Sequence, residues 1–176
     1  RTVEQVVGEN VPYLVTEYAG HMYPTKRFDQ EERLIEHAMR HAVVLNAAYE
    51  NPHISGAVGW CAFDYHTHEN FGSGDRICYH GVMDNFRVSK FAASVYASQQ
   101  DPKQRSVMVP LTNWTRGDRN MAQSVPIYVF TNCDKIEVCY NGQSRGFYTR
   151  EESGKFAHLP YPPIVLKEFN FLWGEP

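Results

Sequence analysis

Cysteine is scarce in this sequence, and none of it stands in a C-x-x-C motif. The 176 residues contain 4 cysteines, which are few for a disulfide framework in a chain of this length. We therefore expect free thiols, and the redox compartment of the protein stays open. The four positions are Cys61, Cys78, Cys133 and Cys139.

An excess of positive charge and a long apolar run are also absent. The formal net charge of -3 leaves no basic stripe to neutralise phosphates, which argues against nucleic acid as the main partner. No run approaches the roughly 18 apolar residues of a membrane span. The first residues, RTVEQVVGENVP, hold neither an initiator Met nor the apolar core of a signal peptide. We expect a piece of a longer protein, either cytoplasmic or exported.

Aromatic side chains, by contrast, are plentiful, at 14% of the residues. Hydrophobic content of 43% and charged content of 21% otherwise describe an ordinary soluble globular protein. The aromatic content is compatible with carbohydrate contact. A large aromatic core would give the same count, so composition does not decide between them.

Strand-like and helix-like segments alternate in the first half of the chain. Short apolar runs predict strands over residues 12–18 and 54–65. Helical spacing of apolar residues predicts helices over residues 29–50 and 89–100. Strand, helix, strand, helix is the order typical of a parallel α/β sheet.

The helix expected over residues 29–50 has recognisable ends. Asp29 followed three residues later by Glu32 is a capping-box pattern. Asn51-Pro52 stops the helix, because proline cannot continue it.

One carboxylate stands at the end of each expected strand. An unpaired charge at the end of a buried strand is costly, so we interpret Glu17 as a functional residue rather than a structural one. Asp64 stands at the end of the second run. In parallel sheets and barrels the carboxyl ends of the strands carry the functional site.

After residue 101 the sequence becomes rich in β-strand signals. SVMVPL, SVPIYVFTN, KIEVCYNGQSRGF and IVLKEFNFLW predict four or five strands, with turns at residues 132–134 and at Asn141-Gly142. An immunoglobulin-like sandwich has roughly seven, so the second domain looks incomplete.

Four segments together resemble glycoside hydrolase family 2 β-galactosidases. They are VTEYAGHMYP, GAVGWCAFDY, DRICYHGVMD and VPIYVFTNCDKIEVCYNGQSRG, in this order and spacing. The resemblance implies that residues 1–100 are the C-terminal portion of a (β/α)8 barrel catalytic domain, its last two βα units. Residues 101–176 would begin the β-sandwich that follows.

The resemblance implies a retaining glycosidase, in which two carboxylates flank the glycosidic bond. Thr16-Glu17-Tyr18 matches the family's S/C-E-Y motif, so Glu17 is the expected nucleophile. Tyr18 follows it directly, and alternation along a strand would send Tyr18 to the opposite face for packing. The family's acid/base Glu follows an Asn, and no Asn-Glu pair occurs here. We expect residues 1–176 alone to be inactive.

The resemblance also implies four substrate-binding candidates. Trp60 matches an aromatic-rich stretch, either as a wall for the sugar or as core packing. Asp64 keeps the family's Asp, for a sugar hydroxyl or an Arg. His80 occupies the place of a sugar-binding Asn, and imidazole can donate or accept there. His21 comes one place later than the family's His.

The expected substrate is a neutral sugar, galactose first. Glucuronidases of the family carry Asn-x-Lys to bind the uronate, and the matching Cys78, Tyr79 and His80 include no cation. The resemblance implies a β-galactoside and the rest of the parent barrel as partners, and homo-oligomers are common in the family. We expect no cofactor. A family 2 glycosidase of other specificity stays an alternative, and the natural aglycone is undetermined.

A metal hydrolase is a rival interpretation, because the chain has 8 His. His37 and His41 lie four apart in HAMRH, but zinc helices usually read H-E-x-x-H. We expect this pair to be exposed or facing a partner, and no metal site.

A non-catalytic carbohydrate-binding or interaction module is the second rival. Its motivation is the aromatic content of the β-rich half. In the family this sandwich is mostly a structural spacer. The residues concerned are Trp114, Tyr128, Tyr140, Phe147 and Tyr148.

Overall fold

The computed structural model of the 176-residue chain divides into two compact units, residues 1–95 and residues 96–176. The structure describes residues 5, 11–19, 23–69, 74–114, 126–151 and 154–167.

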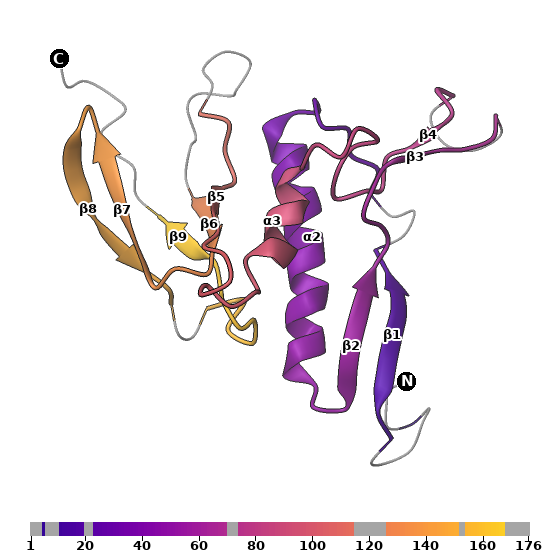
Figure 1. The fold of residues 1–176 in the computed structure, drawn as a ribbon, viewed down its shortest axis with the longest axis horizontal. Coiled ribbons are helices and arrows are strands. Elements are labelled where there is room, and N and C mark those ends of the chain that lie inside the picture. The colour runs from indigo at the N-terminus through magenta and orange to yellow at the C-terminus, as the bar shows by residue number, and fades with distance from the viewer. Residues whose placement is uncertain are drawn as a thin grey trace. The chain divides into compact units, whose positions relative to one another are not determined.

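The first unit is built on two parallel strands joined by a long helix (Figure 1). Strand β1 spans Tyr13–Tyr18, helix α2 spans Glu31–Glu50, and strand β2 spans Ile54–Gly59. The strands pair in parallel from Tyr13 opposite Ile54 to Tyr18 opposite Gly59. The predicted strand-helix-strand order is therefore confirmed.

Helix α2 (Glu31–Glu50) buries one apolar stripe and begins without the expected capping box. Its N-cap is Gln30, whose side chain makes no capping hydrogen bond. The prediction of Asp29 as the cap is wrong, because a carboxylate oxygen of Asp29 accepts a hydrogen bond from the amide of Lys26 instead (2.7 Å). The buried residues are Leu34, His37, Ala38, Met39, His41, Ala42 and Leu45.

Strand β1 is less buried than its apolar sequence predicts. Leu14 in β1 and Val58 in β2 are each 54% exposed. In the part of the chain that the structure describes, β1 and β2 pair only with each other. Figure 1 shows α2 running alongside the two strands, and a sheet of two strands with one covering helix leaves its other face open.

The segment after β2 folds back on itself rather than extending the strand to Tyr65 as predicted. Strands β3 (Tyr65–His66) and β4 (Ile77–Cys78) form a short antiparallel pair. Helix α3 follows as Phe91–Ala97, shorter than the predicted helix over residues 89–100.

The second unit contains a three-stranded antiparallel sheet and a hairpin. The sheet has the order β5-β6-β9, formed by Met108–Pro110, Ile127–Thr131 and Ile164–Leu166. Strands β7 (Lys135–Tyr140) and β8 (Gln143–Thr149) form the hairpin. These elements confirm the β-rich character predicted for this half of the chain.

The hairpin turn and the core of the second unit follow from the sequence. Asn141 (φ 49°) and Gly142 (φ 78°) both have positive φ, as the predicted Asn-Gly hairpin turn requires. Strands of both the sheet and the hairpin supply one aliphatic cluster. Its buried members are Ile127, Val129, Ile136, Ile164 and Leu166, with Val138 and Tyr148 packed against them.

Candidate active site

Glu17 lies near the carboxyl end of β1, where it is exposed. The next residue, Tyr18, is half-buried, and its ring centroid lies 6.0 Å from that of His41 on α2. Tyr18 therefore packs against the helix, as strand alternation predicts. Glu17 is the accessible carboxylate of this motif, which is what attack on a substrate requires.

The parallel pairing brings Trp60 to the same edge as Glu17. The amide of Trp60 donates a hydrogen bond to the carbonyl of Tyr18 (2.7 Å). The indole is 37% exposed and meets the ring of Tyr65 edge-on, with centroids 6.0 Å apart. Trp60 thus exposes part of an apolar ring at the strand ends where Glu17 also lies.

His80 lies on a segment that runs beside the residues after β2. Its carbonyl accepts a hydrogen bond from the amide of Cys61 (3.4 Å), and the carbonyl of Cys61 accepts one from Val82 (2.9 Å). The imidazole is buried, with Nδ1 2.7 Å from Sγ of Cys78. The structure thus brings His80 next to the backbone that follows Trp60.

Asp64 is buried and bound to a cation. Its Oδ1 accepts hydrogen bonds from Nζ of Lys90 (2.6 Å) and from the amide of Gly81 (2.9 Å). Burial raises the pKa of the Asp64 carboxyl and lowers the pKa of Lys90, while the bond between them acts against both changes. The partner of Asp64 is therefore Lys90, rather than the sugar hydroxyl or the Arg that the sequence suggested.

His21, the fourth binding candidate, lies outside the described residues. Its role stays a prediction.

The expectation that His37 and His41 are exposed or face a partner is wrong. Both imidazoles are buried on α2, with their Nε2 atoms 3.3 Å apart. Burial lowers the pKa of His37 to about 3 and that of His41 to about 4, and the charge of Lys90 contributes to both. The two histidines repeat at helical spacing with Leu34, Ala38 and Leu45, which lie on the same buried stripe. This spacing was the sequence signal that could have predicted their burial.

The described residues contain no group of three or more His, Cys, Asp or Glu side chains arranged to hold a metal ion. No helix in this part of the chain is long and apolar enough to cross a membrane.

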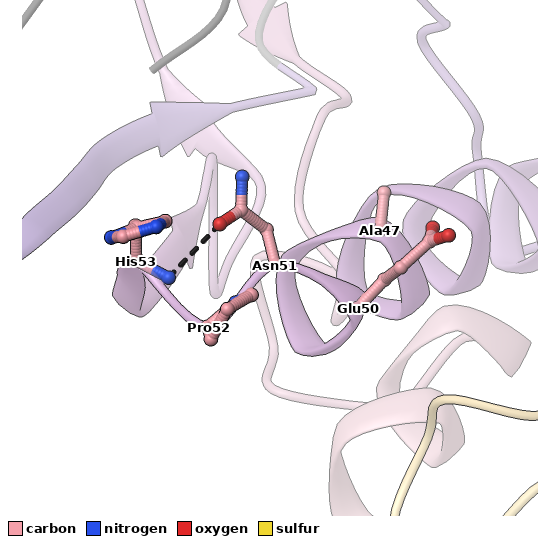
Figure 2. A pocket seen from close by; sticks show the side chains of 5 residues that line it. All are labelled: Ala47, Glu50, Asn51, Pro52 and His53. Atoms are coloured by element: carbon pink, nitrogen blue, oxygen red, sulfur yellow. Dashed lines mark hydrogen bonds between the residues drawn. The ribbon is translucent and has the colours of Figure 1, made fainter. Parts of the chain in front are cut away.

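An open depression of about 460 Å³ lies where α2 leads into β2, at the opposite end of the strands from Glu17 (Figure 2). Asn51 Oδ1 accepts a hydrogen bond from the amide of His53 there (2.9 Å). In Figure 2 the side chains of Glu50 and His53 point away from each other. Binding sites combine an enclosed apolar cavity with convergent polar groups, and this depression has neither. Its lining is Ala47, Glu50, Asn51, Pro52 and His53.

Similarity to known proteins spans nearly the whole chain, although no protein-family model matches it. A β-galactosidase of Thermoanaerobacterium thermosulfurigenes is 53% identical over 168 residues, covering 94% of this chain and 24% of that protein. A β-galactosidase of Rhizobium meliloti is 46% identical over 171 residues, covering 93% of this chain and 22% of that protein. The chain thus spans about a quarter of the length of these relatives.

Solved structures of lower identity share the fold. A β-glucuronidase 2 from Bacteroides uniformis superposes with a TM-score of 0.63 at 18% identity, covering 95% of this chain and 20% of that one. A Parabacteroides merdae β-glucuronidase gives a TM-score of 0.59 at 20% identity, covering 88% of this chain and 21% of that one.

Over nearly its whole length the chain is similar to a segment of proteins named β-galactosidase, which supports the resemblance to glycoside hydrolase family 2.

Proposed function

We propose that residues 1–176 form the part of a retaining β-galactosidase that carries the catalytic nucleophile, Glu17. The observation that carries this proposal is the 53% identity, over 94% of this chain, to a protein named β-galactosidase. The exposure of Glu17 beside Trp60, where β1 and β2 end, supports its role. In this function Glu17 attacks the anomeric carbon and forms a glycosyl-enzyme, which water then hydrolyses.

The second carboxylate of the reaction lies outside residues 1–176 in this proposal. A retaining pair stands about 5 to 5.5 Å apart, and the acid/base must exchange a proton with the leaving oxygen. Asp64 is committed to Lys90, and exposed Glu69 pairs with Arg76 at 3.5 Å. Neither supports an acid/base role. The parent would complete the (β/α)8 barrel around β1 and β2, with the β-rich unit as the start of the sandwich.

The proposed substrate is a terminal β-D-galactoside. Trp60 would form an apolar wall for the sugar, and His80 and His21 would contact its hydroxyls. The segment of Cys78, Tyr79 and His80 supplies no cation for a uronate. Lys26 lies over the ring of Tyr79 at 4.6 Å, but its ammonium is bound to Asp75 (3.2 Å). The preference for a neutral sugar rests on this segment and on the names of the relatives.

Hydrolysis of an aryl β-galactoside tests the proposal in the complete enzyme that contains these residues. Glu17→Gln should lower kcat by at least about 10³-fold, because the amide cannot form the glycosyl-enzyme. Glu69→Gln is the matched control and should leave the rate unchanged. An aryl β-glucuronide should be cleaved far more slowly than the galactoside.

Residues 1–176 alone, folded, should give no turnover. Turnover that disappears in Glu17→Gln would locate an acid/base within this chain. Full activity of Glu17→Gln in the complete enzyme would remove Glu17 as the nucleophile.

A further inference from the structure

Lys90 is a fully buried cation that has no part in the proposed reaction. Its side chain is 0% exposed. The ammonium donates hydrogen bonds to Asp64 Oδ1 (2.6 Å) and to the carbonyl of Thr25 (2.6 Å). The backbone amide of Lys90 donates to the carbonyl of Val82 (2.9 Å). Burying an ammonium is costly unless the geometry is good and its hydrogen bonds are made.

These contacts join segments that are distant in the sequence. Thr25 belongs to the connection from β1 to α2, and its amide donates to the carbonyl of Tyr79 (2.9 Å). Asp64 belongs to the segment after β2 and holds the amide of Gly81 with the same oxygen that binds Lys90. Lys90 and its partners therefore fix the backbone on both sides of His80.

The crossing of these segments is too close for any side chain at position 81. A Cβ atom on Gly81 would lie 2.2 Å from the amide nitrogen of Asp64 and 2.5 Å from the carbonyl oxygen of Met83. Backbone hydrogen bonds join the same two segments. The amide of Asp64 donates to the carbonyl of Met83 (2.9 Å), and the amide of Met83 donates to the carbonyl of Ala62 (3.0 Å). Because the fit is this tight, a shift of Asp64 is transmitted to Gly81 and hence to His80.

We propose that Lys90 is a positioning residue for sugar binding: through Asp64 it holds the segment that carries His80, which lies against the backbone that follows Trp60. This inference rests on the proposed function. Lys90 does not touch the substrate, because its ammonium is buried and bonded to Asp64 and Thr25. Asp64 acts in the same way and is a positioning residue rather than a sugar ligand.

A double-mutant cycle in the complete enzyme tests the coupling. Lys90→Met, which keeps the length of the side chain without the charge, should lower kcat/KM for an aryl β-galactoside about tenfold, since small misplacements of binding groups are expensive. His80→Ala should lower it by a similar factor. If Lys90 acts through His80, adding Lys90→Met to His80→Ala costs no more than about twofold further. Lys167→Met, at an exposed lysine paired with Glu151, is the matched control and should change nothing.

The outcomes separate this inference from the proposed function. Unchanged kcat and KM in a folded Lys90→Met enzyme overturn it, as does a double mutant whose loss equals the product of the single losses. A wild-type enzyme that does not cleave the galactoside, or whose activity does not depend on Glu17, removes the proposed function instead.

A second variant decides the case in which Lys90→Met does not fold. Asp64→Asn combined with Lys90→Gln replaces the ion pair by two amides that can still bond to each other and to Gly81. Its kcat/KM should stay within about threefold of the wild type, because the hydrogen-bonded connection is kept. A folded double variant whose loss is tenfold or more, or one that also fails to fold, contradicts the inference.

Discussion

The two units bury different kinds of side chain. Among the described residues, every buried ionisable polar side chain lies in the first unit: His37, His41, Asp64, His80, Asp84 and Lys90. The second unit buries an aliphatic cluster, and its buried polar side chains are neutral. Asn132, for example, accepts a hydrogen bond from the amide of Val107 and donates hydrogen bonds to the carbonyls of Gln100 and Arg105.

The first unit thus buries charged and ionisable side chains, whereas the core of the second unit is aliphatic. Aliphatic burial stabilises without directional requirements, at about 25 cal/mol per Å² of apolar surface. Buried charges stabilise little and are sensitive to the loss of a partner, but they fix the relative positions of the groups that hold them. In the first unit the buried Asp64 and Lys90 connect the segments after β1 and after β2.

Removal of one charge from the buried pair should give the largest effect on stability. Asp64→Leu leaves the ammonium of Lys90 buried with no counterion, which should lower the free energy of unfolding by about 3 to 5 kcal/mol. Hydrogen exchange followed by mass spectrometry can compare α2 with β6 in the purified chain. We expect the loss of protection in α2.

The matched control removes an exposed aspartate. Asp134 is fully exposed and lies 3.3 Å from Arg150. Asp134→Leu should leave the free energy of unfolding nearly unchanged, since surface ion pairs contribute little. Equal losses in the two variants would show that burial of the pair is not what makes Asp64 sensitive.

Acid should weaken the first unit next most strongly. The pKa of His37 is about 3 and that of His41 about 4 in the folded chain, below the 6.5 of an unperturbed imidazole. Below pH 6.5 the unfolded chain therefore binds more protons than the folded chain. The stability that the two neutral histidines contribute is fully present above pH 6.5 and is lost as the pH falls from 6.5 toward the folded pKa values. Between pH 7 and pH 5 the loss should be about 2 kcal/mol per histidine.

The same exchange measurement at the two pH values checks this expectation. Three further ionisable groups, Lys90, His80 and Arg33, also lower the pKa of His37, because positive charge on them disfavours its protonation. Replacement of His37 and His41 by Gln should flatten the pH dependence of α2, whereas replacement of the exposed His66 should not. A pH dependence as steep in the Gln variant as in the wild type would assign the acid sensitivity to other groups.

The sequence predicted the elements of both units better than their ends. Alternation and helical spacing are local signals, and they identified β1, α2, β2 and the β7–β8 hairpin. The predicted strand over residues 54–65 stops at Gly59, which is opposite Tyr18, the last residue of β1. A strand continues only where a neighbouring strand pairs with it, and the sequence of β2 does not show where β1 ends.

The candidate site was also predicted only in part, because a sequence motif is a local signal and does not identify partners that are distant in the chain. Glu17, Trp60 and His80 came from motifs, and the structure brings their backbones to one edge. Lys90 gave no local signal, because its partners Asp64 and Thr25 lie 26 and 65 residues away. For Asp64 the sequence suggested a sugar hydroxyl or an Arg as the partner, and it did not identify Lys90, which folds back to it.

Deletion of one methyl group in the second unit should give the smallest effect and the cleanest check of the comparison. Ile164 on β9 is fully buried within the aliphatic cluster. Ile164→Val should lower the stability of the β5-β6-β9 sheet by about 1 kcal/mol, from lost apolar burial and a small cavity. Because valine fits without leaving a polar group unpaired, the cost should not change between pH 7 and pH 5. A loss of protection in α2 as large as in β6 would mean that the two units do not have separate cores, and the contrast between a polar and an aliphatic interior would then describe one cooperative structure.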